Sequence, residues 1–341
     1  MKQKFFFLNS LVVLFACIIT ITSCGSDDET HSTSGPYGYD FSAKNDVGVT
    51  LFYKFSTMDY NEVVLVSPSA GYYKGDIRIP PEVTYKGNVY RVTSIGESTF
   101  LQSQLTSVTI PYGVTSIEDK AFYGCIELTS IVIPNSVTKI GNSAFHLCWG
   151  ATSLTLGNSV TSIGDDAFTC CSFESIEIPS SVKEMGRNCF SKNNSLKSVT
   201  ILNGVTKIGN YAFYSCSNLK FVTIPNSVTE LGDDAFGDCE SLESITIPNN
   251  VTTIGNYAFE GCSTLESITI PNSVKELGEY AFHGCTSLTK IYSHITEPFP
   301  IYEYGMGIED HVTLFVPLGT KSKYKSTQGW KKFTSIEEIE Y

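Results

Sequence analysis

The sequence predicts a repeat solenoid, mostly β, with a β cap at each end. Its core would be about nine coils of roughly 22–23 residues, with short turn or helical pieces. A single unit has too little core to fold alone, so the units must stack. An I-G step marks each unit, and its first slot holds Ile95, Ile117, Ile140, Ile163, Met185, Ile208, Leu231, Ile254 and Leu277. A paired Phe keeps the same step at Phe100, Phe122, Phe145, Phe168, Phe190, Phe213, Phe236, Phe259 and Phe282.

Residues 1–23 are predicted to be a lipoprotein signal peptide. A basic start at residues 1–4 precedes an apolar run at residues 5–21, which is short for a transmembrane helix. The end of this run, I-T-S-C, resembles a bacterial lipoprotein box, in which cleavage leaves Cys24 as the lipidated first residue. Ordinary signal cleavage and a membrane anchor are the alternatives. Removal of the segment takes the formal charge from −12 to −14, because it carries Lys2 and Lys4.

Residues 24–36 are predicted to form a flexible acidic tether, rich in Ser, Thr and Gly. The acids at residues 27–29 resemble the signal that sends lipoproteins of Bacteroides-like bacteria to the outer face of the outer membrane. A solvated tether explains the same acids, and both interpretations can hold. We therefore expect the protein on the outer membrane, facing the exterior, with membrane contact through the N-terminal lipid alone.

Residues 37–94 are predicted to form an N-terminal β cap with a partial repeat. Residues 49–55 and 62–66 have the composition and alternation of strands. Residues 77–83 match the I-x-I-P-x-x-V half of the repeat, and its other half arrives nine residues late. The delay predicts an inserted hairpin at residues 84–91 that turns at Gly87-Asn88. The cap would cover the open apolar end of the stack.

Residues 95–295 form the solenoid itself. In each coil, L-x-S-I-x-I-P predicts a strand ended by proline, with inward side chains such as Leu128, Ile131 and Ile133. V-T-x-I-G predicts a second extended stretch, stopped by a Gly that we expect to adopt turn angles. Asp or Asn then begins a short turn or helical piece that carries the inward Ala and Phe. The coils that begin at residues 95 and 163 lack one residue between Phe and the next strand, which marks a surface loop there.

Over residues 77–295 the pattern resembles the BspA-type leucine-rich repeats of bacterial surface proteins. Residues 296–341, with G-W-K-K-F at 329–333, resemble the C-terminal cap of that family. The departures are local: Gly157 replaces the proline that ends the strand, and Cys189 stands in the Ala slot. The resemblance implies an adhesin or another surface-binding module, and it brings no catalytic residue, metal or cofactor.

The cysteines favour a buried thiol ladder. Of 11 cysteines, Cys17 and Cys24 belong to the N-terminal segment and nine remain. A disulfide framework is the alternative for an exported protein. The odd number, and in-register side chains that point the same way, favour buried thiols. Zinc is expected less than either, because the sequence has no C-x-x-C pair and only five His. One slot, three residues after the Phe, holds Cys125, Cys148, Cys216, Cys239, Cys262 and Cys285, joined by Cys171 or Cys170.

The sequence contains no enzyme constellation, and we expect neither catalysis nor a cofactor. His146 lies near Cys148, but in the variable loop, where a solvated His is expected. The Asp pairs at 165–166 and 233–234 recur at the turn before A-F, where Asp is expected to cap a helical piece. The formal charge of −12 makes nucleic acid a poor partner.

Two columns of side chains are candidate ligand contacts. The first column is the outward strand slot, which holds Thr223, Thr246 and Thr269. Beside it runs a column of Ser in which Phe221 takes one place. The alternative is that Thr and Ser only fill a flat strand face and bind nothing. The second is the aromatic column before Ala, where half-buried packing is the alternative. This column contains Tyr211, Tyr257 and Tyr280.

These features predict a monomeric, lipid-anchored cell-surface binding protein, an adhesin for host or matrix proteins. A glycan-binding accessory module that depends on Tyr257 and Tyr280 is one alternative. A purely structural surface repeat protein is the other.

Overall fold

The computed structural model describes residues 38–57, 61–67, 69–302, 306–308 and 310–341. They belong to one compact unit, Ser34–Tyr341. The predicted signal peptide, Cys24 and the acidic tether lie outside the described residues. Within the described part of the chain, no helix combines the length and the apolar character needed to cross a bilayer.

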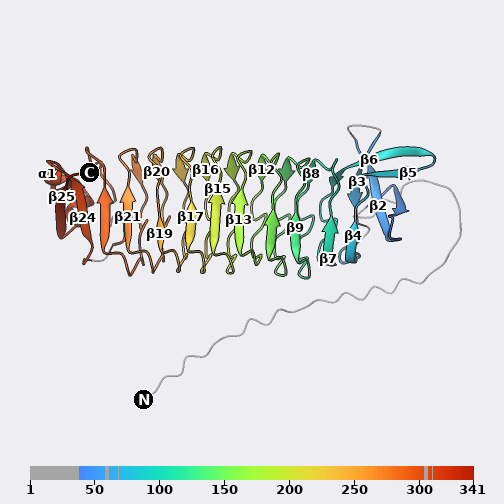
Figure 1. Ribbon diagram of the computed structural model, residues 1–341, viewed down its shortest axis with the longest axis horizontal. Coiled ribbons are helices and arrows are strands. Elements are labelled where there is room, and N and C mark those ends of the chain that lie inside the picture. The colour runs from blue at the N-terminus through green and yellow to red at the C-terminus, as the bar shows by residue number, and fades with distance from the viewer. Residues whose placement is uncertain (1–37, 58–60, 68, 303–305, 309) are drawn as a thin grey trace, which may run out of the picture. The chain divides into compact units, whose positions relative to one another are not determined.

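One long sheet is built from the V-T-x-I-G stretches, because each places its Val and Ile side chains inward and pairs with the same stretch of the next coil. It has 13 strands, and consecutive coils pair in parallel and in register (Figure 1). Its coil strands are β6 (Asn88–Ile95), β8 (Ser116–Ile117), β10 (Lys139–Ile140), β12 (Ser162–Ile163), β14 (Glu184–Met185), β16 (Lys207–Ile208), β18 (Glu230–Leu231), β20 (Thr253–Ile254) and β22 (Glu276–Leu277).

The L-x-S-I-x-I-P stretches form the other strand face, split into several parallel sheets. Alternation sends Ile131 and Ile133 into the core, as predicted. The strands are β4 (Lys74–Arg78), β7 (Gln104–Thr109), β9 (Ser130–Val132), β11 (Ser153–Thr155), β13 (Ser175–Ile178), β15 (Ser198–Ile201), β17 (Phe221–Thr223), β19 (Ser244–Ile245), β21 (Ser267–Ile270) and β23 (Lys290–Ser293).

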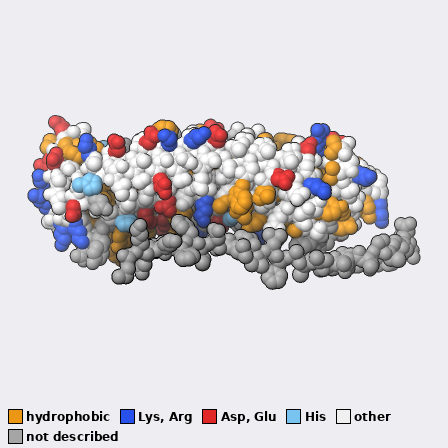
Figure 2. Space-filling view, turned by 90° about the horizontal axis from the view of Figure 1, so that it is seen from below, with side chains coloured by type: hydrophobic (Ala, Val, Ile, Leu, Met, Phe, Trp, Pro, Cys, Tyr) orange, Lys and Arg blue, Asp and Glu red, His pale blue; other side chains and the backbone are white. Residues whose placement is uncertain are grey.

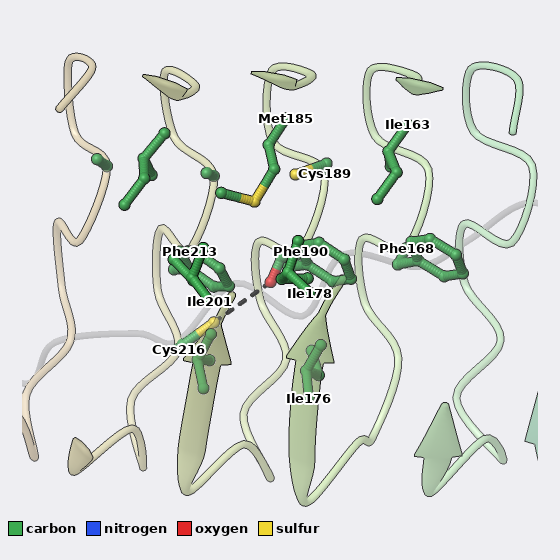
Figure 3. Close-up of a cluster of buried hydrophobic side chains, with 14 of the residues drawn as sticks. Ile163, Phe168, Ile176, Ile178, Met185, Cys189, Phe190, Ile201, Phe213 and Cys216 are labelled. Atoms are coloured by element: carbon green, nitrogen blue, oxygen red, sulfur yellow. Dashed lines mark hydrogen bonds between the residues drawn. The ribbon is translucent and has the colours of Figure 1, made fainter. Parts of the chain in front are cut away.

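The core contains a continuous column of the nine repeat Phe rings. Consecutive rings stack with centroids 4.7–5.7 Å apart and planes within 16° of parallel. Figure 3 shows three of them, Phe168, Phe190 and Phe213, in line across successive coils. This repeat is close to the ~4.8 Å between neighbouring strands. The structure confirms the predicted repeat solenoid.

At the N-terminal end, β1 (Phe41–Lys44), β2 (Thr50–Phe55) and β3 (Glu62–Val66) pair antiparallel, and β3 runs parallel to β6. The Tyr73 ring begins the aromatic column, 4.9 Å from Phe100. The predicted hairpin is present as β5 (Glu82–Tyr85) paired with β6. It turns at Lys86-Gly87 and not at Gly87-Asn88, because those two residues carry the positive φ angles of 49° and 82°.

At the C-terminal end, β24 (Thr313–Pro317) and β25 (Ser335–Ile339) add two parallel strands beside β23. The helix α1 (Lys321–Ser326) and the 3₁₀ turn η1 (Trp330–Lys332) lie between them in sequence. Trp330 is fully buried, and its Nε1–H donates to the Phe299 carbonyl at 2.9 Å. The indole thus fills the core of the cap without leaving its donor unpaired.

The sequence predicts either a turn or a short helical piece before each A-F, and the structure has a turn there. Its N–H groups bond the next coil: Lys120 donates to Asn142 O at 2.9 Å and Phe122 to Ala144 O at 2.7 Å. The residue two before each Phe also has a left-handed φ, which an α-helix does not tolerate. These residues are Ser98, Lys120, Ser143, Asp166, Asn188, Tyr211, Asp234, Tyr257 and Tyr280.

The Asp or Asn after each Gly serves the neighbouring coil, so the expectation that it caps a helical piece was wrong. Asn142 Oδ1 accepts the N–H of Asp165 at 2.9 Å, and Asp165 Oδ1 accepts the N–H of Arg187 at 2.7 Å. Asp233 does the same for Asn256 at 2.8 Å. The first Asp of each pair, Asp165 or Asp233, is therefore part of an inter-coil ladder.

The Gly of the I-G step is required by close packing and not by turn angles. A Cβ on Gly255 would lie 2.5 Å from the backbone N of Asp233 and from the carbonyl carbon of Gly232 in the preceding coil. Gly255 is not among the described residues with positive φ. Neighbouring coils therefore touch backbone to backbone at this step.

Candidate binding surfaces

Aromatic and acidic side chains gather on the turn stretches of the later coils. We call this group the tyrosine–carboxylate surface. The predicted Tyr257 and Tyr280 stack with centroids 5.4 Å apart and planes 10° from parallel. Tyr211 meets Tyr214 edge to face at 5.6 Å. Asp234 is buried beneath the surface, His283 is exposed, and the other members are half-buried. The surface comprises Tyr211, Tyr214, Asp234, Asp238, Tyr257, Glu260, Tyr280 and His283.

The carboxylates of this surface influence one another. Burial raises the pKa of Asp234 to about 6, opposed by a hydrogen bond from Tyr211, and the negative charges of Glu260, Asp233 and Asp238 raise it further. A hydrogen bond to Asp238 is the main cause that raises the pKa of Tyr214 to about 12. His283 Nδ1 lies 3.0 Å from Glu260 Oε1. At neutral pH the surface therefore carries concentrated negative charge between aromatic rings.

One cation already lies against an aromatic ring at the edge of this surface. The Arg187 guanidinium sits 4.5 Å from the centroid of the Tyr211 ring. This distance is typical of a cation–π contact. The contact shows how a basic side chain fits the Tyr column.

The predicted strand-face column lies on a different part of the coil. Phe221 is 54% exposed and stands between Ser198 and Ser244 in the register of β15, β17 and β19. Thr223 and Thr246 are exposed and Thr269 is half-buried. The structure therefore does not bring Phe221 and the Thr column together with the Tyr column, which lies on the turn stretches.

The cysteine slot forms the buried thiol ladder that the sequence predicts. Each Sγ donates to the carbonyl of a Phe in the preceding coil, as Cys216 does to Phe190 at 3.3 Å (Figure 3). Cys171 joins the ladder and Cys170 does not. Asn193 takes the slot in one coil and donates through Nδ2 to Phe168 O at 2.9 Å. The nine cysteines of the described chain are free thiols.

Comparison with known proteins identifies the repeat. A family model described as the BspA type leucine rich repeat region matches residues 93–220 and 206–297, in six copies. The chain belongs to the BspA-type leucine-rich repeat family. No curated protein matches it.

Among solved structures, the BspA-type chain is similar to a leucine-rich repeat protein from Bacteroides ovatus. The identity is 24%, with 82% of this chain and 100% of that one covered and a TM-score of 0.41. A leucine rich cell surface protein from Faecalibacterium prausnitzii matches at 24% identity, covering 75% and 95%, with a TM-score of 0.32. The pneumococcal vaccine antigen PcpA matches at 20%, covering 89% and 100%, with a TM-score of 0.45.

Two further expectations for this BspA-type chain concern chemistry. His146 was expected to be solvated, but it is half-buried, stacked 5.2 Å from Tyr123, and desolvation lowers its pKa. Cys148 donates into the core, to Phe122 O at 3.3 Å. Over the described ranges, no group of three or more His, Cys, Asp or Glu side chains is placed to hold a metal ion.

Sequence reasoning missed the partners of the Tyr column. Tyr214, Asp238 and Glu260 stand one or two residues after a repeat Phe. Tyr214 and Glu260 lie beside the Tyr of their own coil, and Asp238 hydrogen-bonds Tyr214 of the preceding coil. A signal existed, since each of these slots recurs once in every coil. Aligning the slots after the Phe, as well as those before it, would have placed the acids beside the rings.

Proposed function

We propose that this chain is a lipid-anchored protein of the outer cell surface, an adhesin that binds an extended, basic segment of a host or matrix protein. The tyrosine–carboxylate surface carries the proposal, because it repeats aromatic rings and carboxylates at the spacing of the coils. A Lys or Arg side chain placed over these rings meets both a π face and a carboxylate, as Arg187 meets the ring of Tyr211.

The physical form of the surface suits an extended partner. An extended chain places a side chain on the same face about every 6.6 Å, and coils stack at ~4.8 Å, so the long side chains of Lys and Arg are what lets one segment reach several rings. Aromatic anchors contribute most of the energy at such interfaces. The negative charge of the protein makes the binding sensitive to salt.

The cellular location is supported by two observations. The I-T-S-C sequence followed by acids has the features of a lipoprotein box and an export signal. The chain belongs to the BspA-type leucine-rich repeat family, which occurs in bacterial surface proteins. On this proposal Cys24 carries the lipid and the solenoid faces the exterior.

The binding experiment uses residues 25–341 and a fluorescent peptide of alternating Arg and Ser. We expect Tyr257→Ala with Tyr280→Ala to weaken binding at least tenfold, and 0.5 M salt to weaken binding of the wild type. Phe221→Ala is the matched control, since it removes an exposed ring from the strand face. Loss of binding in the Phe221 variant alone would refute the assignment to the Tyr surface.

The location is tested separately in cells. Cys24→Ala should release the protein from the membrane fraction, because no lipid can then be attached. Replacement of Asp27, Asp28 and Glu29 by Ala should keep the protein in that fraction but protect it from protease added to intact cells. A Cys24 variant that sediments with membranes as the wild type does would overturn the anchor.

A further inference from the structure

A recess opens at the loop edge of the stack, in the coils that precede Tyr257 and Tyr280. We call it the loop notch; its volume is about 360 Å³. Its lining includes Trp149, Cys170, Ser172, Lys192, Asn194 and Ser195. Figure 2 shows the side of the molecule that lies below the strands in Figure 1, with hydrophobic side chains gathered near mid-length in a mostly polar face.

The notch exists because one coil is short. Between the ladder Cys171 and the inward Phe173 there is a single residue, Ser172. The coils on both sides place two residues there, Trp149-Gly150 and Asn194-Ser195. The short loop therefore leaves a gap between two longer ones, walled on one side by an indole and on the other by polar side chains.

The indole wall is exposed and held in place. Trp149 is 58% exposed, and its ring stacks on no other aromatic ring in the described part of the chain. The next residue, Gly150, packs closely against the backbone of the preceding coil and so holds the loop in place. A Cβ on Gly150 would lie 2.6 Å from the carbonyl oxygen of Ile126. A large apolar side chain kept in water on a rigid loop costs hydrophobic free energy, which a ligand can recover.

The opposite wall offers hydrogen-bonding groups and a single cation. Lys192, Asn194 and Ser195 are exposed, and Ser172 and Ser215 are half-buried. The carbonyl of Asn194 accepts from Asn218 Nδ2 at 2.6 Å, which ties this loop to the next coil. An apolar peptide anchor would leave these polar groups unpaired, and unpaired buried polar groups are costly. A ligand with one apolar face and a polar rim fits both walls.

We propose that the loop notch is a binding site for an acidic saccharide. The C–H face of a sugar ring lies against Trp149, its hydroxyls pair with Asn194 and the serines, and its carboxylate pairs with the Lys192 ammonium. The volume lies at the small end of the ~300–1,000 Å³ of ligand sites, so a short saccharide is the size that fits. The notch adjoins the Tyr214 end of the protein-binding surface proposed above, since the Lys192 N–H donates to Tyr214 O at 2.7 Å, but it contains neither Tyr257 nor Tyr280.

The test titrates residues 25–341 with trigalacturonic acid and with neutral maltotriose, by calorimetry and tryptophan fluorescence. Of the two Trp residues, Trp330 is fully buried in the C-terminal cap, so a spectral change reports on Trp149. We expect the acidic probe to bind at least fivefold more tightly than the neutral one. Trp149→Ala should weaken binding at least tenfold, and Lys192→Gln should remove the preference for the acid.

Two controls separate the site from general stability. Ile126→Ala alters the same loop slot one coil earlier, where Ile126 is 51% exposed, and should leave binding unchanged. Insertion of one Gly between Ser172 and Phe173 restores the common coil length, and should abolish binding while the protein unfolds at an unchanged temperature. The Tyr257 and Tyr280 variants should bind the saccharide normally, whatever they do to peptide binding.

The overturning results are equally direct. Failure of wild-type protein to bind either saccharide at millimolar concentration would refute the proposal. So would binding that survives both Trp149→Ala and the Gly insertion. A notch that takes up an aromatic peptide through Trp149 but no saccharide would reassign the site to a protein ligand.

Discussion

From Phe122 onward, the slot three residues after each repeat Phe holds a side chain that donates a hydrogen bond to a Phe carbonyl of the preceding coil. Cys does this in most coils and Asn193 does it in one. The repeat Phe carbonyls are buried, and most of them already accept a backbone N–H of their own coil, as Phe122 O does from Cys125 at 3.2 Å. A carbonyl oxygen has two lone pairs, so the side chain in the slot provides the second donor. Cys supplies a weak donor there, and Asn193 supplies a stronger one that also reaches Phe190 O at 2.8 Å. The slot therefore selects a small side chain with a donor, and no redox role is needed to explain the cysteines.

Thiol labelling tests this reading at single residues. Burial raises the pKa of Cys216 and Cys285 to about 12, and that of Cys239 well above its ordinary value. Thiolates are the reactive form, so iodoacetamide at pH 8 should label only half-buried Cys170 in the native described chain. All nine thiols should react after unfolding.

The control for that experiment is Cys170→Ser, which should remove the native label detected by mass spectrometry. Rapid native labelling at any ladder position would contradict the buried assignment. Absence of free thiols after unfolding would show disulfides instead.

Between coils, the I-G step sets the closest backbone approach. Gly255→Ala places a methyl group 2.5 Å from backbone atoms that no side-chain motion can relieve. We expect a loss above the ~1–3 kcal/mol of ordinary overpacking, measured by urea unfolding.

Gly124→Ala is the matched substitution. Gly124 has φ +70°, but its Cβ would meet only the flexible side chain of Gln102, at 3.2 Å. The same slot holds Leu147, Cys170 and Lys192 with similar φ. Its cost should stay near the ~1–2 kcal/mol of a left-handed residue. Equal losses of unfolding free energy for Gly255→Ala and Gly124→Ala would show that the close backbone approach at Gly255 does not contribute to stability.

The coil period was enough to predict the strands, the inward residues and the Cys ladder, because these depend only on which slot a residue occupies. The turn stretch could not be predicted in this way. Its N–H groups bond another coil, as Phe122 does to Ala144 O, and local propensity does not see that partner. The candidate sites were incomplete for the same reason: Tyr214 and Asp238 meet across coils, and the lining of the loop notch comes from four coils.

Over the whole stack, stability should be a nearest-neighbour property. Phe236 is fully buried, with Phe213 and Phe259 each 5.6 Å away, so Phe236→Ala should cost about 3–5 kcal/mol. Hydrogen exchange should accelerate most in the flanking coils and least in the caps around Tyr73 and Trp330. Uniform acceleration from end to end would show that the stack unfolds as one cooperative block.

The inter-coil ladders join equivalent positions: Phe stacks on Phe, the Asp or Asn side chain accepts the backbone N–H of the equivalent residue in the next coil, and Ile-Gly packs on Ile-Gly. Every middle coil therefore offers the same kind of contacts to the coil before it and to the coil after it, so any middle coil can follow any other. Duplication or loss of the stretch of gene that encodes one coil would leave every junction satisfied. At the proposed location, the distance that the protein extends from the cell can therefore change by whole coils, while both caps and the sites within other coils stay unaltered.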